Sequence, residues 1–272
     1  MGERIPENKM GTMPVGKLLA GMAIPMMISM LVQALYNVVD SIFVAQLSED
    51  ALNAVSLAFP LQNLMIAFGG GTAVGINALL SRSLGEKKQD MADKAANTGI
   101  FLSLCNFVVF ALIGIFFSRT FFQLQAGGEE VIVEYGTQYA TICLGCSIGI
   151  FSQFCFERLL QSTGRTTLAM CTQLIGAVTN IILDPILIYG LGMGVIGAAI
   201  ATVFSQTISA VWVVCFLCGK KTKLRLYPPH MRLEWKLIGP VLALGASPFI
   251  MSATESLVGI VINTSLRSVS LD

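Results

Sequence analysis

Long apolar segments, each free of Asp, Glu, Lys and Arg, alternate with short charged segments along most of the chain. A membrane-spanning helix needs about 20 mostly apolar residues, and only helices or closed barrels satisfy their backbone groups within lipid. The alternation of polar and apolar residues that a barrel requires is absent. The pattern therefore predicts seven transmembrane helices, near 15–46, 52–80, 94–118, 131–158, 166–189, 195–218 and 237–266.

The composition of the chain agrees with this interpretation. Of its 272 residues, 54% are hydrophobic and 12% are charged, whereas a soluble domain carries about 25% charged residues. The net charge of +1 and the lack of a basic domain argue against a nucleic-acid partner. The first residues, MGERIPENKMGTM, are charged and lack a cleavage site of small residues, so we do not expect a signal peptide. We predict an all-α, polytopic membrane protein.

Lysine and arginine predict the orientation of the helices. If the N-terminus is cytoplasmic, all of the 17 Lys and Arg residues except Arg119 and Arg267 fall on the cytoplasmic side. Loops that face the cytoplasm are enriched in these two residue types. We therefore expect a multi-pass protein of the plasma membrane with its N-terminus in the cytoplasm.

The first predicted helix is repeated in the seventh. Residues 19–29, LAGMAIPMMIS, and residues 242–252, LALGASPFIMS, share five identities at an offset of 223, including Pro25 and Pro248. Because both helices would run outward, the repeat unit is six helices and the two units are parallel. We predict a complete six-helix lobe at 1–218, a basic cytoplasmic linker at 219–236 and the first helix of a second lobe at 237–272. We expect that last helix to be the least well anchored element, and a second lobe or another copy of the chain to be required for activity.

Polar residues recur at helical spacing within several apolar segments. Such residues share one face of a helix, and in lipid that face must meet other helices or a water-filled cavity. The stripes are Ser29, Gln33, Asn37 and Asp40; Gln173, Gly176, Asn180 and Asp184; Thr202, Gln206 and Ser209; and Ser252, Glu255, Gly259 and Asn263. For Gln33, Gln173 and Gln206, we favour the interpretation that they only bridge helices.

Asp40 and Asp184 indicate a functional role more strongly than these glutamines do. A carboxylate at the bilayer centre costs roughly 2.5–3.5 kcal/mol on insertion scales, and such groups usually mark ion or proton pathways. No Lys or Arg is predicted at their depth, and Pro185 leaves the carbonyl of Ile181 without its helical donor. We predict a functional role for both carboxylates. We interpret Glu157 and Arg158, at the cytoplasmic end of a predicted helix, as lying at the membrane–water interface.

The sequence gives little support for a metal site, a disulfide or an enzyme active site. Cys143 and Cys146, like Cys215 and Cys218, have the spacing of half a metal site, but the only histidine, His230, lies in a predicted loop. We expect neither a disulfide nor a zinc site. No nucleophile, base and acid form a catalytic set, so we do not expect an enzyme.

Several segments resemble the multidrug and toxic compound extrusion (MATE) family. They are IPMMISMLVQALYNVVDSIFVAQL, RLLQSTGRT, TNIILDPILIYGLGMGVIGAAIAT and SPFIMSATES. The resemblance implies one six-helix lobe of a twelve-helix, two-lobe transporter, followed by its seventh helix. It also implies export of cationic or amphipathic small molecules in antiport with H⁺ or Na⁺, with no other cofactor.

The resemblance also assigns residues. It implies a coupling-cation site for H⁺ or Na⁺ at Asp40, Asn180, Asp184 and Thr202; if the ion is Na⁺, the first three would hold it, and no other metal is expected. We expect a substrate cavity lined by Gln33, Tyr36, Asn37 and Glu255.

Three alternatives remain open at this stage. A flippase for lipid-linked precursors, from the same superfamily, would need basic residues in its cavity, and the predicted helices contain none. A seven-helix receptor would not repeat its first helix in its seventh. A non-transporting membrane fragment agrees with the sequence as well, and the coding sequence beyond residue 272 would distinguish it.

Overall fold

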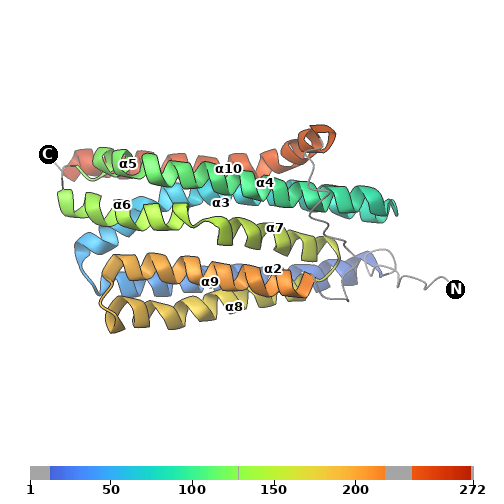
Figure 1. The fold of residues 1–272 in the computed structure, drawn as a ribbon, viewed down its shortest axis with the longest axis horizontal. Coiled ribbons are helices and arrows are strands. Elements are labelled where there is room, and N and C mark those ends of the chain that lie inside the picture. The colour runs from blue at the N-terminus through green and yellow to red at the C-terminus, as the bar shows by residue number, and fades with distance from the viewer. Residues whose placement is uncertain (1–12, 128, 218–234, 271–272) are drawn as a thin grey trace.

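The computed structural model describes residues 13–127, 129–217 and 235–270, and every regular element in these ranges is helical. The elements are α2 (Val15–Ala45), α3 (Glu49–Gly85), α4 (Gln89–Phe116), α5 (Ser118–Gln125), α6 (Glu130–Gly145), α7 (Ile148–Ser162), α8 (Thr166–Pro185), the π-helical turn η1 (Ile186–Gly190), α9 (Gly194–Leu217) and α10 (Trp235–Ser270) (Figure 1). Within these ranges six helices are long and apolar enough to cross a membrane, and α6 and α7 together form a seventh, bent span. The predicted all-α, polytopic membrane fold is confirmed.

The helices form an elongated bundle with two groups and a bent span between them (Figure 1). Helices α2, α8 and α9 pack together in one group, and α3, α4 and α10 pack together in the other. The span made of α6 and α7 contacts α3 and α4 on one side and α9 on the other. Aromatic side chains fill the interior, including Phe110, Phe122, Tyr139 and Phe151. The bundle therefore has a packed core beside the polar cavity described below.

Local sequence determines where α3 begins and why it can pack closely. Ser48 caps the helix, since its hydroxyl accepts the N–H of Ala51 at 3.1 Å, and Glu49 and Asp50 stabilise the positive end of the helix dipole. The buried face of α3 consists largely of alanine and glycine. Small residues let helix backbones approach closely, which is how helices associate within membranes. Pro60 lies inside α3 and leaves the carbonyl of Ser56 without its helical donor.

The predicted continuous helix at 131–158 is wrong in its interior. The chain leaves the helix at Cys146 and Ser147, and α6 and α7 meet at an angle of 44°. Gly145, Ser147 and Gly149 all have weak helix propensity, so a break there costs little. Gly149 also packs directly against Thr207 of α9, where a Cβ atom would lie 2.7 Å from the threonine hydroxyl. Apolar periodicity does not report such a break because both halves remain apolar.

The expectation that the last helix would be poorly anchored is also wrong. Helix α10 lies along α3, with Phe249 edge-on to Phe68 at a ring distance of 4.8 Å. Gly71 of α3 contacts Gly245 backbone to backbone, and one turn away Gly75 contacts the carbonyl of Val241. These glycines allow the two helix backbones to touch.

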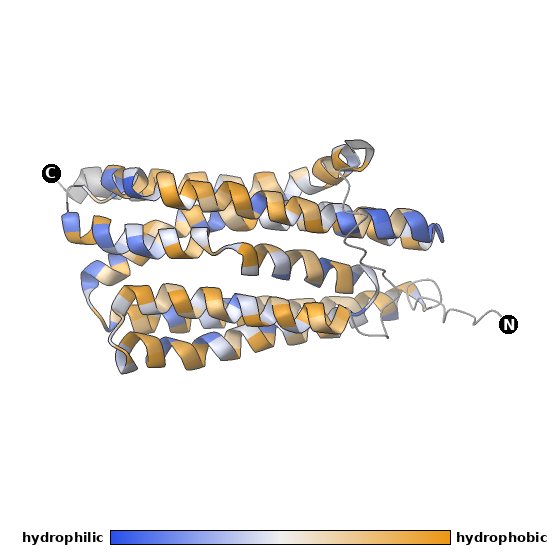
Figure 2. Ribbon diagram, in the orientation of Figure 1, coloured by the Kyte–Doolittle hydropathy of each residue, from blue (hydrophilic) through white to orange (hydrophobic). Residues whose placement is uncertain are grey.

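One end of the bundle carries most of the described basic residues. It is formed by the start of α2, the α3–α4 connection, and the end of α7 with the start of α8, and we call it the basic end. Its residues are Lys17, Arg82, Lys87, Lys88, Lys94, Arg158 and Arg165. Figure 2 shows hydrophilic residues at the α3–α4 connection and apolar residues along the middle of the helices. Hydrogen bonds and charge from Lys88 and Arg82 hold the pKa of the exposed Glu86 at about 2.

Some predictions fall outside the described residues. The N-terminal segment 1–12, nearly all of the linker 219–236, and the side chains of Cys218, His230, Asn263 and Arg267 belong to this group. The division of the chain into a lobe, a linker and a second lobe stays a prediction. The six described cysteines are free thiols.

The α3–α10 contact leads to a stability prediction. A Cβ atom on Gly75 would overlap the carbonyl oxygen of Val241, whereas one on Gly70 would meet nothing within 4 Å. Gly75→Ala should therefore lower the thermal stability of the detergent-solubilised protein, with an overpacking cost of about 1–3 kcal/mol. Gly70→Ala is the matched control, and it should be neutral or slightly stabilising because alanine favours the helix. Equal melting temperatures for the two variants would show that α10 does not pack on α3 in this way.

Candidate functional site

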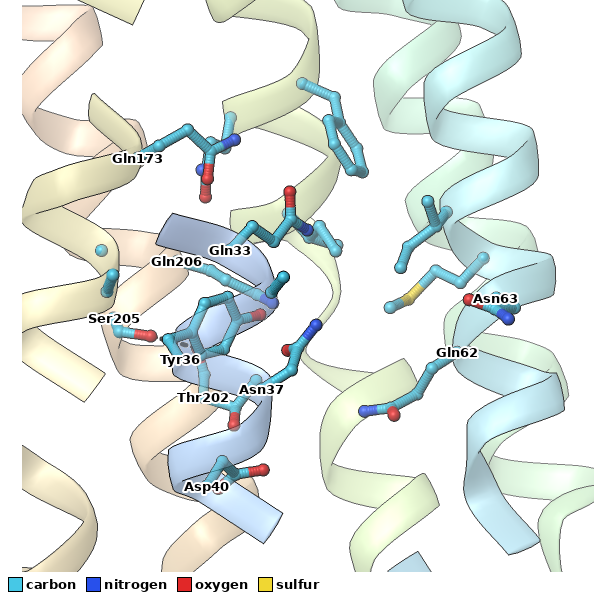
Figure 3. A pocket seen from close by; sticks show the side chains of 18 of the residues that line it. Gln33, Tyr36, Asn37, Asp40, Gln62, Asn63, Gln173, Thr202, Ser205 and Gln206 are labelled. Carbon is cyan, nitrogen blue, oxygen red and sulfur yellow. Dashed lines mark hydrogen bonds between the residues drawn. The ribbon is translucent and has the colours of Figure 1, made fainter. Parts of the chain in front are cut away.

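A cavity of about 380 Å³ opens between the two groups of helices (Figure 3). Helices α2, α8 and α9 contribute one wall, and α3 and α7 contribute most of the other. The polar residues that line it are Gln33, Tyr36, Asn37, Asp40, Gln62, Asn63, Tyr139, Gln153, Gln173, Thr202, Ser205 and Gln206. Asp40 is the only charged residue among the described lining, which includes no Lys, Arg or His. The cavity is therefore polar, rich in side-chain amides, and acidic at one place.

Helix packing explains why the polar stripes face this cavity. Helices α8 and α9 approach closely at Gly176, where a Cβ atom would lie 2.6 Å from the hydroxyl of Ser209. That hydroxyl donates to the carbonyl of Thr172 at 3.1 Å. The close contact turns one side of each helix toward the other and directs Gln173, Thr202 and their neighbours along the stripes into the space beside α2.

Asp184 and Asp40 meet at one end of this space. Asp184 is 0% exposed, and Asn180, one turn earlier on α8, is 1% exposed. The amide of Asn180 donates to one Asp184 carboxyl oxygen at 3.2 Å. Asp40 of α2 lines the cavity and lies close enough to Asp184 for the two carboxyl groups to interact. The three side chains thus form one cluster that reaches from the cavity into the α2–α8 contact.

Three oxygen atoms of this cluster have no hydrogen-bond partner. They are Asp40 Oδ1, Asn180 Oδ1 and Asp184 Oδ2, and all three are buried. A buried polar atom without a partner costs about 1–3 kcal/mol. Carboxylate and amide oxygens accept from a proton-bearing group or coordinate a hard cation such as Na⁺, so this donor set fits either ion.

The segment after Asp184 departs from regular α-helix. Pro185 ends α8, and Ile186–Gly190 forms a π-helical turn in which the N–H of Leu191 donates to Ile186. Tyr189 of this turn donates its hydroxyl to the carbonyl of Phe43 at 2.6 Å and so joins the turn to α2. π-Helical turns are rare and occur frequently at functional sites. Gly192 and Gly194, both with positive φ, then lead into α9.

The structure brings most of the predicted site residues together. Asp40, Asn180 and Asp184 form the cluster, while Thr202 is 8% exposed and lines the cavity. Of the predicted substrate residues, Gln33, Tyr36 and Asn37 also line it. These are statements about position, and the roles of the residues stay predictions.

Glu255 lies apart from this cavity. It is exposed on α10, and α10 packs against α3 and α4, on the far side of the bundle from α8. Glu255 does not line this cavity. Its contact with a substrate stays a prediction.

Two interpretations of the polar residues change. Gln173 and Gln206, for which we favoured a bridge between helices alone, line the cavity, as does Gln33, which we also expected in the substrate cavity. Glu157, which we expected to be interfacial, is only 5% exposed, and it accepts hydrogen bonds from Gln153 at 3.2 Å and from Gln173 at 3.0 Å. Glu157 lies at the end of an apolar segment, which suggested a place at the membrane–water interface. The contact between α7 and α8 covers its side chain instead.

Other lining residues were missed by the sequence analysis. Gln62 and Asn63 of α3, Gln153 of α7, Tyr139 of α6 and Ser205 of α9 all contribute to the cavity. Gln62 donates to the hydroxyl of Tyr139 at 3.2 Å, which ties α3 to α6. The adjacent pair Gln62 and Asn63 stands out in an apolar segment and could have been found. The others carry no signal, because isolated polar residues are common in membrane helices.

The fold and the site define a polytopic helical membrane protein with a polar, acidic cavity at the centre of one bundle. The family profile described as MatE matches residues 25–186, which is more than half of the chain. The chain belongs to this family.

Relatives with curated names are described as multidrug export proteins. The Multidrug export protein MepA of Staphylococcus haemolyticus (strain JCSC1435) is 26% identical over 253 residues, covering 93% of this chain and 56% of the relative. MepA of Staphylococcus saprophyticus subsp. saprophyticus is 24% identical over 242 residues, covering 89% of this chain and 53% of the relative. The chain therefore spans about half the length of the curated relatives it matches.

Solved structures show the same fold. One is an outward-facing conformation of a multidrug resistance MATE family transporter of the MOP superfamily. It superposes with a TM-score of 0.84 at 28% identity, over 94% of this chain and 57% of that one. Another is a MOP superfamily transporter from Pyrococcus furiosus, described as having a binding pocket of reverse polarity that suggests a different function. It superposes with a TM-score of 0.83 at 25% identity, over 99% of this chain and 63% of that one.

The hydrogen bond between Asn180 and Asp184 can be tested by stability. Asn180→Leu removes the described donor to a fully buried carboxyl group and should cost about 1–3 kcal/mol of unfolding free energy. In an Asp184→Leu background the same change should cost little, because the carboxyl oxygen to which Asn180 donates is already absent. Thermal unfolding of the four purified proteins measures the difference. Equal costs in both backgrounds would show that the bond does not stabilise the cluster.

Proposed function

We propose that this chain takes part in secondary active efflux, in which cationic or amphipathic small molecules leave the cell in exchange for H⁺ or Na⁺. The single observation that carries the proposal is the cluster of three unpartnered oxygens at Asp40, Asn180 and Asp184 beside the cavity. The names of the relatives, which are multidrug export proteins, support the same activity.

The cluster is the coupling-cation site in this proposal. An ion there offsets the cost of burying two interacting carboxyl groups. A proton would let one carboxyl group donate to the other, and Na⁺ would take Asp40 Oδ1, Asn180 Oδ1 and Asp184 Oδ2 as ligands. Thr202, which lines the cavity on α9, is the fourth predicted member of the site.

Asp40 connects the coupling ion to the substrate. It is the only described residue that both belongs to the cluster and lines the cavity. A cationic substrate is stabilised when Asp40 is ionised and less so when a proton or Na⁺ neutralises it. Substrate and coupling ion therefore compete, and competition of this kind is the thermodynamic basis of exchange. No enzymatic step is part of the proposal.

The polarity of the cavity favours a cationic substrate. A flippase for lipid-linked precursors has to hold a pyrophosphate, which calls for Lys or Arg, and the described lining contains neither. The lining instead combines side-chain amides with Asp40 and apolar residues such as Phe59 and Phe154. This combination suits amphipathic cations.

The end of α8 is the element we propose to move. The π-helical turn begins directly after Pro185, and Tyr189 joins it to Phe43 of α2. A change in the charge of Asp184 therefore acts where α8 is least regular and where it is attached to α2. The basic end faces the cytoplasm of a plasma-membrane protein in this proposal, in agreement with the positive-inside rule. The partners are small-molecule substrates and membrane lipid.

Competition between a cationic substrate and the coupling ion tests the proposed function. The purified 272-residue chain in detergent should bind ethidium, a fluorescent organic cation, and binding should weaken as Na⁺ rises or as the pH falls. Neutralising one cluster carboxyl by Asp184→Asn should reduce this competition at least about tenfold, which corresponds to about 1.4 kcal/mol. Fluorescence anisotropy at fixed ionic strength, with K⁺ replacing Na⁺, measures it. The effective ion, H⁺ or Na⁺, identifies the coupling ion.

Two controls make the result specific. Asp50→Asn changes a carboxylate in the first turn of α3 that does not line the cavity, and it should leave the competition unchanged. In vesicles, Asp184→Asn should also abolish gradient-driven dye movement wherever the unmodified protein shows it. Ethidium binding that responds to neither Na⁺ nor pH would refute the proposed exchange.

A further inference from the structure

Glu157 is a buried carboxylate that the proposed coupling mechanism does not use. It lies on α7 and is 5% exposed. The salt bridges among the described residues all lie in the α3–α4 region and do not include it. Arg158, the adjacent residue, donates to Gln161 at 2.8 Å instead. A carboxylate buried without an ion pair is expensive unless its oxygens accept good hydrogen bonds.

The bonds that Glu157 does accept come from two walls of the cavity. Gln153 of α7 donates its amide N–H to Oε1 at 3.2 Å, and Gln173 of α8 donates to Oε2 at 3.0 Å. Both glutamines line the cavity, while Glu157 does not. Figure 3 shows Gln173 at the opposite end of the cavity from Asp40. Glu157 thus stands behind two lining amides, far from the coupling-cation cluster.

The chemistry of a carboxylate determines how these amides point. An ionised carboxylate only accepts hydrogen bonds, whereas a glutamine amide has a donating –NH₂ on one side and an accepting C=O on the other. Because both –NH₂ groups are directed to Glu157, both carbonyl oxygens are left to face away from it. Two lining residues that could present either polarity are held with their acceptors available to the cavity.

We propose that Gln153 and Gln173, oriented by Glu157, form a second cation-recognition subsite at the end of the cavity opposite Asp40. Its ligand is an organic cation that carries N–H donors, and the two carbonyl oxygens accept from those donors. Glu157 is a positioning residue, since it acts through the amides. This inference rests on the proposed efflux of cationic substrates and adds a specificity determinant to it.

The opposing interpretation is that Glu157 only joins α7 to α8. Both interpretations predict that removing Glu157 lowers stability. They differ in substrate affinity, because only the subsite requires the two amides to face one way. Glu157→Gln is the informative change, since it keeps the shape of the side chain and both helix contacts but offers one donor and one acceptor. One of the two lining amides must then turn and present –NH₂ to the cavity.

The test measures ethidium binding, because ethidium carries both a permanent positive charge and amino N–H donors. In the purified 272-residue chain, Glu157→Gln should weaken ethidium binding about tenfold. Competition by Na⁺ or H⁺ should persist, because Asp40, Asn180 and Asp184 are unchanged. The same substitution in a Gln153→Leu/Gln173→Leu background should have no further effect, as expected when one residue acts through others.

Each outcome decides a separate point. Ethidium bound by Glu157→Gln as tightly as by the unmodified chain overturns this inference alone. An equal loss in the Gln153→Leu/Gln173→Leu background also overturns it, because Glu157 would then act by its charge and not through the amides. No ethidium binding by the unmodified chain overturns the proposed function and the inference together. If Glu157→Gln does not fold, Gln173→Leu carries the test, and unchanged affinity in that folded variant overturns the inference.

Discussion

The rest of the structure depends on burying two interacting carboxyl groups inside a bundle that crosses a membrane. Asp184 is completely buried, Asp40 reaches it from α2, and among the described residues Asn180 donates a hydrogen bond to Asp184. The carboxyl oxygens left without partners make the cluster costly to bury. In the proposed function a small cation reduces that cost, and the state of the cluster would depend on whether an ion is bound. Asp40 also lines the cavity, so a substrate bound there in the proposed function would interact with the same carboxyl group.

Close backbone contacts hold the elements that carry this cluster. Gly176 lets α8 lie against Ser209 of α9, and Gly75 lets α3 lie against α10. Small residues thus position the rigid parts of the bundle, in agreement with how membrane helices associate. The irregular parts are the break between α6 and α7 and the π-helical turn after Pro185. Rigid packing and local irregularity are therefore separated along the chain, and the polar cluster lies next to the second irregular element.

Asp40 in the cavity wall and Glu157 behind it have different positions, which support different roles in the proposed function. Asp40 lines the cavity directly, whereas Glu157 stands behind Gln153 and Gln173. A carboxylate in the wall attracts a cation by charge, and a carboxylate behind two amides determines which of their atoms face the ligand. In the proposed function both arrangements favour positively charged ligands without placing a second charge in the cavity. The combination accounts for a cavity that is acidic, rich in amides and free of basic side chains in its described lining.

The sequence by itself determined the helical membrane class and the approximate limits of the spans, and it predicted that Asp40 and Asp184 face the interior of the bundle. Those features follow from the cost of charge and of unpaired backbone groups in lipid, which is a property of residue type and spacing alone. Only the tertiary structure decided that the span at 131–158 is broken, that α10 packs along α3, and that Glu157 is buried. Each of these depends on which helix lies beside which, and the pairing is determined by side-chain shape across helices distant in sequence. Apolar periodicity shows that a face is buried, but it does not show what the face is buried against.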